Sequence, residues 1–115
     1  YDYATLASAE GLKTVATYAA GIGPERLMII PRGPDGRLAQ PTSLVRDAHA
    51  VGLEVHPWTF RPENYFLPEG LKSGPDPRAA GDVDSEIRTY LATGIDGLFS
   101  DSTAAAVKAL AQPQR

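Results

Sequence analysis

Two histidines, His49 and His56, carry the side chains best suited to acid–base or metal chemistry in this sequence. A histidine can act as a general base, and its neutral ring can bind a metal ion. His56 stands within a stretch of β-branched and aromatic residues, where a packed, hydrogen-bonded histidine is the more common outcome. His49 lies in a segment with helical periodicity, so we expect it on the helix surface or in packing. The sequence contains no cysteine, which excludes a cysteine nucleophile and thiolate zinc sites.

The acidic residues do not predict paired acid–base catalysis or a calcium loop. Asp96 and Asp101 flank the last predicted strand, and five strand residues place them about 16 Å apart, so they cannot share a site. We expect Asp101 to cap the final helix or to brace the mouth of the fold. A second acidic group comprises Asp76, Asp82, Asp84 and Glu86. Its spacing is not that of a calcium loop, and we expect solvated loop and helix N-terminus there.

The most suggestive binding feature is Trp58, the only tryptophan, followed three residues later by Arg61. A flat aromatic ring beside a guanidinium fits a ligand with an apolar or polyol body and an anionic head. The period of two along a strand predicts that His56, Trp58 and Phe60 share one face. The alternative is that Trp58 only covers the core, and the residues alone leave both open.

Helical and extended patterns alternate along the chain. Helices are predicted over residues 8–20, 42–51, 84–92 and 102–111, and extended segments over 21–23, 53–60 and 95–101. Strands separated by helices run parallel with right-handed crossovers, so the fold class is α/β. The strand centres lie 34 and 42 residues apart, near the roughly 31 residues of one unit in an eight-stranded (β/α) barrel. In such folds the loops after the strands carry function. The proline-rich loop 61–83 is one of them, and a loop that long is usually functional or disordered.

Composition sets further limits. The chain of 115 residues has a formal net charge of −3 and is 43% hydrophobic, which fits one globular domain and gives no basic footprint for nucleic acid. No apolar stretch is long enough to cross a bilayer. The sequence starts without methionine or a signal peptide, so we expect it to come from inside a longer protein. The absence of cysteine leaves the compartment undecided.

Three ordered stretches carry a resemblance: "YAAGIGPERLMII", "LVRDAHAVGLEVHPWTFRPEN" and "GIDGLFSDSTAAAV". They resemble consecutive segments near the C-terminus of glycerophosphodiester phosphodiesterases, the periplasmic bacterial type especially. The resemblance implies a (β/α)8 TIM barrel, of which residues 1–115 would be a single partial domain supplying about strands six to eight. It also implies that Trp58 lines the substrate pocket, with Phe60 and Phe99 as apolar neighbours and Arg61 at the rim.

The same resemblance implies the activity of the parent protein. Such enzymes hydrolyse glycerophosphodiesters to an alcohol and glycerol 3-phosphate with a divalent metal, Ca²⁺ or Mg²⁺, in lipid and glycerol metabolism. The His-Arg-Gly motif of the family is absent, and neither His49 nor His56 matches a catalytic position. We therefore assign no catalytic residue and no metal ligand here, and expect the metal ligands outside this chain. We expect the isolated segment to be inactive and its parent to be periplasmic or secreted.

The sequence departs from the family pattern at two places. "SDST" replaces the usual "TD-x-P", and Ala20 replaces a common aspartate. The main alternative is a noncatalytic, degenerate half-barrel that acts as an interaction or oligomerising module, because open strand edges invite association. The missing N-terminal part of the barrel or a second copy would then cover them. A nucleotide-binding domain is disfavoured because "GIGPE" lacks the third glycine and the lysine of phosphate-binding loops.

Overall fold

The computed structural model describes residues 7–100. The predicted closing helix 102–111 and the predicted roles of Asp101 lie outside these residues. Within them the order is α2 (Ala9–Val15), β1 (Gly21–Ile22), the 3-10 helix η1 (Arg26–Met28), α3 (Leu44–Ala50), β2 (Glu54–Val55), the 3-10 helix η2 (Asn64–Phe66) and α4 (Val83–Leu91). Helices and parallel strands therefore alternate, as the α/β assignment predicts.

Local capping explains where α2 and α4 begin. The hydroxyl of Ser8 accepts a hydrogen bond from the backbone N–H of Gly11 at 3.1 Å, and Asp82 accepts one from Ser85 at 3.0 Å. Both are N-cap bonds that satisfy donors of a first helical turn. The helix α3 follows Ser43, which makes no such bond, and is followed by Gly52 at φ 79°. Glycine adopts this left-handed conformation without steric cost, and it stops the helix.

Three extended segments lie side by side and run parallel. β1 pairs with β2 in the register Gly21 to Glu54 and Ile22 to Val55. The pairing continues as a parallel bridge between Glu25 and Trp58, and residues 95–100 add a third segment through a parallel bridge between Phe60 and Ser100. The predicted strand 53–60 and the described part of the predicted strand 95–101, residues 95–100, are thus extended and paired but irregular. Pro57 lacks the N–H that a continuous ladder needs.

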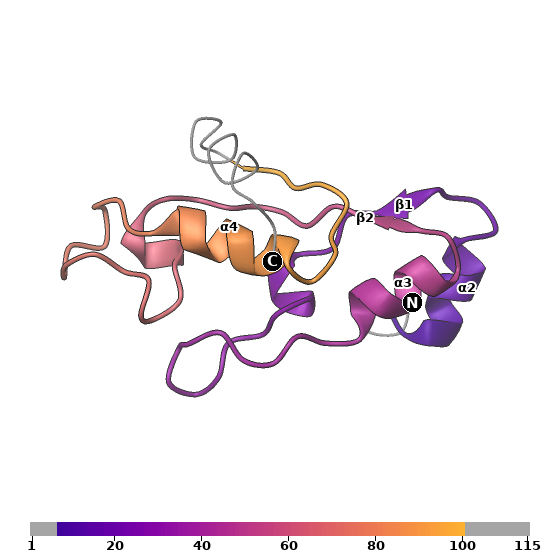
Figure 1. Cartoon of the computed structure of the whole chain (residues 1–115), viewed down its shortest axis with the longest axis horizontal. Helices are drawn as coiled ribbons and strands as arrows, with labels where there is room; N and C mark the ends of the chain where they lie inside the picture. Colours follow the sequence, from indigo (N-terminus) through magenta and orange to yellow (C-terminus); the bar gives the residue numbers. More distant parts are fainter. Residues whose placement is uncertain (1–6, 101–115) are drawn as a thin grey trace.

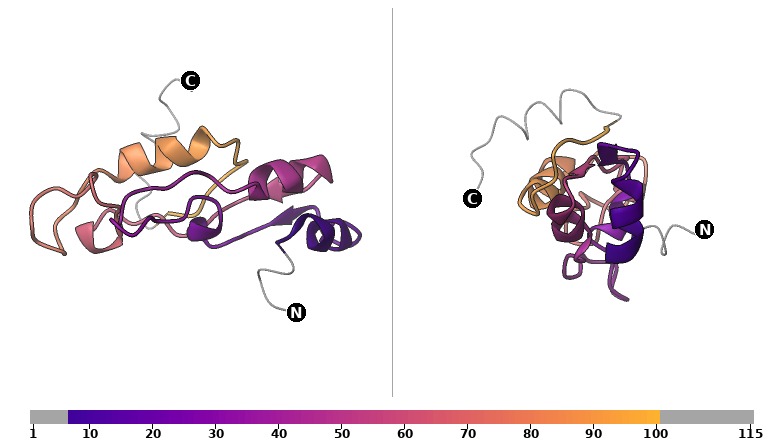
Figure 2. Two further views of the ribbon diagram at one scale, coloured as in Figure 1. Left: turned by 90° about the horizontal axis from the view of Figure 1, so that it is seen from below. Right: turned by 90° about the vertical axis from the view of Figure 1, so that its right-hand side faces the viewer.

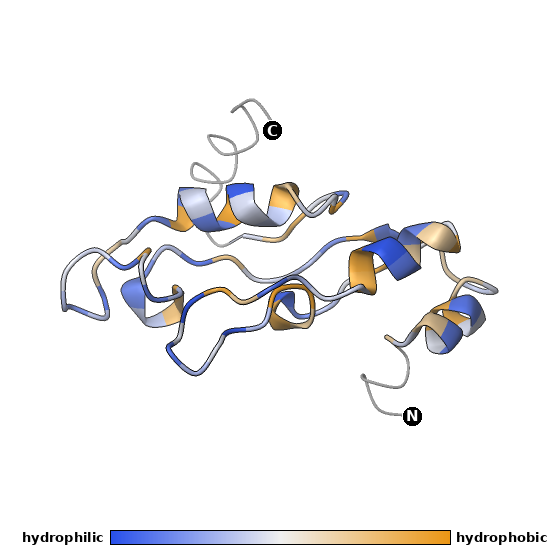
Figure 3. Ribbon diagram, turned by 60° about the horizontal axis from the view of Figure 1, so that its bottom comes forward, coloured by the Kyte–Doolittle hydropathy of each residue, from blue (hydrophilic) through white to orange (hydrophobic). Residues whose placement is uncertain are grey.

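The molecule is elongated, and its elements gather at two ends (Figure 1). α2, α3 and the β1–β2 sheet lie at one end, and α4 with the loop of residues 61–81 lies toward the other, as the perpendicular view also shows (Figure 2). Hydrophobic and hydrophilic residues alternate around α4, as expected of an amphipathic helix (Figure 3). The buried hydrophobic residues described form one connected cluster, to which α2, α3 and α4 contribute.

None of the helices within residues 7–100 is long and apolar enough to cross a membrane.

Candidate functional site

The carboxyl ends of the three extended segments meet at one place, which we call the mouth and define by the backbone of residues 23–26, 58–60 and 99–100. The backbone N–H of Trp58 donates to Pro24 O at 3.2 Å, and that of Arg26 donates to Trp58 O at 3.0 Å. On the other side, the N–H of Phe60 donates to Phe99 O at 3.0 Å. The mouth is therefore a continuous backbone-bonded rim, where ligands bind in parallel α/β folds.

Trp58 occupies the centre of this rim. Its indole Nε1–H donates to Gly23 O at 2.7 Å, which fixes the polar edge of the ring. The residue is nevertheless 43% exposed, and the neighbouring Phe99 is 58% exposed. The peptide bond between Trp58 and Thr59 is cis. Two large aromatic side chains thus remain open at the mouth, and the indole of Trp58 is held in a defined place.

Phe60 departs from the predicted strand alternation. It is fully buried, and its ring meets that of Tyr90 edge to face with centroids 5.0 Å apart. The expectation that it shares a face with His56 and Trp58 is wrong. Regular pairing ends at Val55 and is followed only by isolated bridges, so the period of two need not continue through residue 60. The backbone of Phe60 belongs to the mouth, whereas its side chain packs behind the mouth in the core and has no exposed surface.

Arg61 follows the mouth on the exposed side of the 61–81 loop. Its guanidinium carbon lies 4.9 Å from the ring centroid of Phe66, within the range of a cation–π contact. The ring of Phe66 also meets that of Tyr65 edge to face at 5.0 Å. The predicted rim residue is thus stacked on an aromatic side chain of its own loop.

The 61–81 loop is folded around one buried amide, that of Asn64. Its Nδ2–H₂ donates to Ser73 O at 2.8 Å and to Asp76 O at 2.9 Å, and its Oδ1 accepts from the N–H of Ser73 at 2.8 Å. A buried amide that satisfies both its donors and its acceptor gives such a loop one defined conformation. The loop is therefore ordered, which contradicts disorder, one of the two outcomes that its length predicted.

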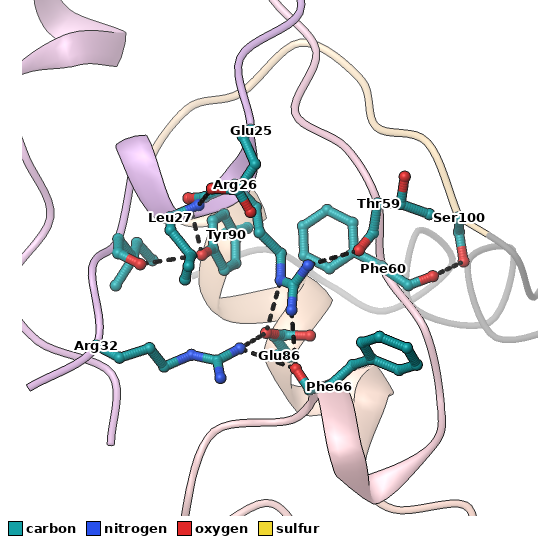
Figure 4. A network of polar contacts seen from close by, with 11 residues as sticks. Glu25, Arg26, Leu27, Arg32, Thr59, Phe60, Phe66, Glu86, Tyr90 and Ser100 are labelled. Atoms are coloured by element: carbon teal, nitrogen blue, oxygen red, sulfur yellow. Dashed lines mark hydrogen bonds and ion pairs between the residues drawn. The ribbon is translucent and has the colours of Figure 1, made fainter. Parts of the chain in front are cut away.

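A buried cluster of charges lies directly behind the mouth (Figure 4). The Oε2 atom of Glu86 lies 3.1 Å from Arg32 Nη2 and 3.5 Å from Arg26 Nε. Arg26 also donates to two backbone oxygens, Nη1 to Thr59 O and Nη2 to Phe66 O, each at 2.8 Å. The guanidinium of Arg26 therefore connects α4, the mouth and the 61–81 loop.

Tyr90 completes this cluster from the next turn of α4. Its hydroxyl is 3.0 Å from Arg26 O and 3.2 Å from Ile30 O, to which it donates. Burial is the main cause that raises the pKa of Tyr90 above its ordinary value, and the negative charge of Glu86 adds to it. The phenol is thus a neutral donor that holds η1 and the residues after it against α4.

Glu86 corrects the expectation of a solvated helix start. It is fully buried, and this burial raises the pKa of its carboxyl, while the positive charges of Arg26 and Arg32 act in the opposite direction. Its Oε1 atom is buried without a hydrogen-bond partner. The other three members of the group lie as predicted: Asp76 is exposed in the loop, Asp82 caps α4 and Asp84 lies in its first turn.

The two histidines lie apart from this cluster. His49 Nε2 is 2.8 Å from Asp96 Oδ2, the same oxygen that accepts a hydrogen bond from the N–H of Val55 at 2.8 Å. The bond to His49 is the main cause that lowers the pKa of Asp96, and the bond from Val55 acts in the same direction. This contact joins α3 to the strands. His49 is therefore a surface residue with a specific partner, which its helical position alone did not indicate.

His56 pairs with a residue of its own strand. Its Nε2 lies 3.0 Å from Glu54 Oε1, and its ring lies over Gly97, where an added Cβ would come within 2.9 Å of the ring carbon Cε1. This is a hydrogen-bonded, packed histidine, although a partly exposed one. Among residues 7–100, no three or more histidine or acidic side chains come together in a way that could hold a metal ion. No metal site is therefore assigned to residues 7–100.

The residues that sequence reasoning missed are Arg26, Glu86 and Tyr90. One local pattern could have identified two of them, because Val83, Glu86, Ile87 and Tyr90 recur at the spacing of one helix face. A glutamate on that apolar face calls for a buried cationic partner. No comparable pattern identifies Arg26, which lies 60 residues before Glu86 in the sequence.

The architecture and the mouth define an α/β protein with parallel strands whose carboxyl ends form a rim. Comparison with known proteins identifies the family. Residues 1–105 match the glycerophosphoryl diester phosphodiesterase family. A similar relative is glycerophosphodiester phosphodiesterase GDPD6 of Arabidopsis thaliana, which is 40% identical over 101 residues. The aligned region covers 88% of this chain and 25% of that protein, so the chain spans about a quarter of its relative. The chain belongs to this family, as the three ordered stretches indicated, and the family implies a TIM barrel.

Proposed function

We propose that this chain is part of a metal-dependent phosphodiesterase that hydrolyses glycerophosphodiesters to an alcohol and glycerol 3-phosphate. In this proposal residues 1–115 supply about strands six to eight of the barrel and one wall of the substrate pocket. Membership of the family supports the reaction class. The observation that carries the wall is Trp58, whose indole is anchored at 2.7 Å to Gly23 O and remains 43% exposed at the mouth.

The chemistry of the wall follows from its side chains. The exposed rings of Trp58 and Phe99 offer apolar surface to the carbon skeleton of a glycerol moiety. Arg61 is the candidate cation for the phosphate, from its stacked position on Phe66. Phe60 stays in the proposal as packing behind the wall. The proposal includes a divalent ion, Ca²⁺ or Mg²⁺, which would supply Lewis-acid chemistry in the parent enzyme. We propose that its ligands and the catalytic histidines belong to other parts of that protein, and that its location is periplasmic or secreted.

The wall is tested in a form of the protein that includes the preceding strands. Trp58→Ala removes the aromatic surface that would contact the substrate. We expect it to raise the KM for glycerophosphocholine about tenfold, which corresponds to ~1.4 kcal/mol of lost contact energy. The matched control is Tyr18→Ala, which removes another exposed aromatic, on the C-terminal side of α2. Release of glycerol 3-phosphate is the readout. An unchanged KM in the Trp58 variant would contradict the wall.

The division of labour is tested with the 115-residue chain alone. We expect no release of glycerol 3-phosphate from glycerophosphocholine in the presence of Ca²⁺ or Mg²⁺. Turnover by the purified chain would overturn the proposal that the chemistry resides elsewhere.

The exposed rings of Trp58 and Phe99 also favour the noncatalytic alternative, an interaction module, because open aromatic surface marks contact sites. The two functions differ in solution. An interaction module predicts a discrete oligomer in which the emission of Trp58 is protected from quencher. A folded monomer by light scattering would count against it.

A further inference from the structure

We propose that Arg26 is a positioning residue that sets the orientation of Trp58 at the mouth. This inference rests on the proposed role of Trp58 as a pocket wall. Every hydrogen bond described above for Trp58 involves the segment 23–26 that leads to Arg26. The indole donates to Gly23 O at 2.7 Å, and the backbone of Trp58 donates to Pro24 and accepts from Arg26.

The side chain of Arg26 adds a hold on the residue after Trp58. Its Nη1 donates to Thr59 O at 2.8 Å, and its Nη2 donates to Phe66 O at the same distance. The side chain is only 11% exposed, so these charge-assisted bonds are largely shielded from water. A planar guanidinium directs both donors at once, which a lysine ammonium on a flexible stem cannot reproduce in the same geometry.

Glu86 fixes the third side of the guanidinium. Its carboxylate lies 3.5 Å from Arg26 Nε, and it comes from α4, whose Tyr90 also binds Arg26 O. The position of Thr59 O relative to α4 is therefore set through Arg26 (Figure 4). Thr59 directly follows Trp58 in the chain. Loss of the guanidinium therefore removes the bond to Thr59 O and frees the backbone that follows Trp58.

Arg32 provides a matched control within the same cluster. Its Nη2 donates to Phe66 O at 3.0 Å and to Glu86 Oε2 at 3.1 Å. Arg32 and Arg26 thus share two partners, the carboxylate of Glu86 and the carbonyl of Phe66. The bond to Thr59 O is made by Arg26. Replacing either arginine removes one positive charge from Glu86. Only replacement of Arg26 removes a bond next to Trp58.

The intrinsic fluorescence of the chain is a direct readout, because Trp58 is its only tryptophan. We compare Arg26→Met, Arg26→Lys and Arg32→Met by acrylamide quenching and by emission maximum, with the urea midpoint measured in parallel. We expect Arg26→Met to raise the quenching constant up to about twofold, since 43% of Trp58 is already exposed. Arg32→Met should lower the midpoint and leave the quenching constant within about 20% of wild type.

The conservative variant keeps the inference testable if Arg26→Met does not fold. Arg26→Lys retains the charge beside Glu86 and can reach at most one of the two carbonyls at a time, so we expect an intermediate quenching constant. A folded Arg26 variant with the quenching and emission of wild type overturns the inference. Equal changes in the Arg26 and Arg32 variants overturn it as well, because they would show a general loosening of the cluster.

These measurements need no substrate, which separates this inference from the proposed function. In the longer protein we expect Arg26→Met to raise the KM for glycerophosphocholine with little change in kcat. If Trp58→Ala leaves KM unchanged while Arg26→Met still alters the quenching of Trp58, the pocket wall is wrong and the positioning role stands. If Trp58→Ala raises KM and Arg26→Met alters neither KM nor quenching, the positioning role is wrong and the wall stands.

Discussion

The hydroxyl of Tyr90 offers a clean test of the buried cluster, because Tyr90→Phe removes a single oxygen atom. That oxygen lies 3.0 Å from Arg26 O and 3.2 Å from Ile30 O. The ring remains, so the edge-to-face contact with Phe60 at 5.0 Å is kept and no large cavity forms. The change therefore isolates the bonds that hold η1 and Ile30 against α4.

The magnitude follows from what the loss leaves behind. One O–H is shared between two carbonyls, and its removal leaves the fully buried Ile30 without this donor for its carbonyl. An unsatisfied buried acceptor costs about 1–3 kcal/mol. We expect the free energy of unfolding to fall by that amount. With a urea m-value of roughly 1–3 kcal/mol per M, the midpoint should move down by on the order of 1 M.

The assay is equilibrium urea unfolding followed by far-UV circular dichroism and by Trp58 fluorescence. The matched control is Tyr18→Phe, because Tyr18 is 72% exposed. Exposed substitutions of this kind stay within about 0.5 kcal/mol of wild type. A Tyr90→Phe variant as stable as the Tyr18→Phe control would falsify the supporting role of the hydroxyl.

Three further perturbations test the packing and the electrostatics of the fold. Phe60→Ala should lower the free energy of unfolding by about 3–5 kcal/mol in urea, since it empties a fully buried ring site; a loss below about 1 kcal/mol would contradict its burial. Gly81→Ala should lower the free energy of unfolding by about 1–3 kcal/mol, because the added Cβ would come 2.9 Å from the backbone oxygen of Leu71. The matched control is Gly23→Ala, whose Cβ would meet nothing closer than 3.5 Å, and it should unfold at nearly the wild-type urea midpoint. In the fold, His49 is the main cause that lowers the pKa of Asp96 below its ordinary value of 3.8. The carboxylate therefore contributes to stability above pH 3.8, and this contribution is lost as the pH falls through the folded pKa. The stability difference between wild type and Asp96→Asn should shrink in acid unfolding below that pH, and a pH-independent difference would refute the pairing.

The sequence predicts those parts of the fold that depend on neighbouring residues. Ser8 begins a helix and Gly52 follows one, because capping and left-handed backbone are properties of a few adjacent residues. The parallel order of three extended segments follows from their separation by helices. The exposed aromatic at the mouth could also be anticipated, because Trp58 stands at the carboxyl end of a strand.

The contacts behind the mouth depend on residues far apart in the chain. Arg26 and Glu86 are separated by 60 residues, and His49 and Asp96 by 47. Such pairs are set by tertiary packing, and charge type alone does not select a partner among the other acidic and basic residues. The orientation of Phe60 also could not be predicted from strand periodicity. Regular pairing ends at Val55, and the side chain of Phe60 points into the core.

The buried cluster explains how a helix outside the mouth can influence the mouth. α4 carries Glu86 and Tyr90 on the same face as the apolar residues of its stripe, so the packing of the helix and the positions of both polar groups are fixed together. Both groups bind Arg26, and the guanidinium of Arg26 binds the carbonyl next to Trp58. A shift of α4 would have to break a shielded ionic contact or carry Arg26 with it. The geometry at Trp58 is therefore determined as much by the helix face of Glu86 as by the strand that contains the tryptophan.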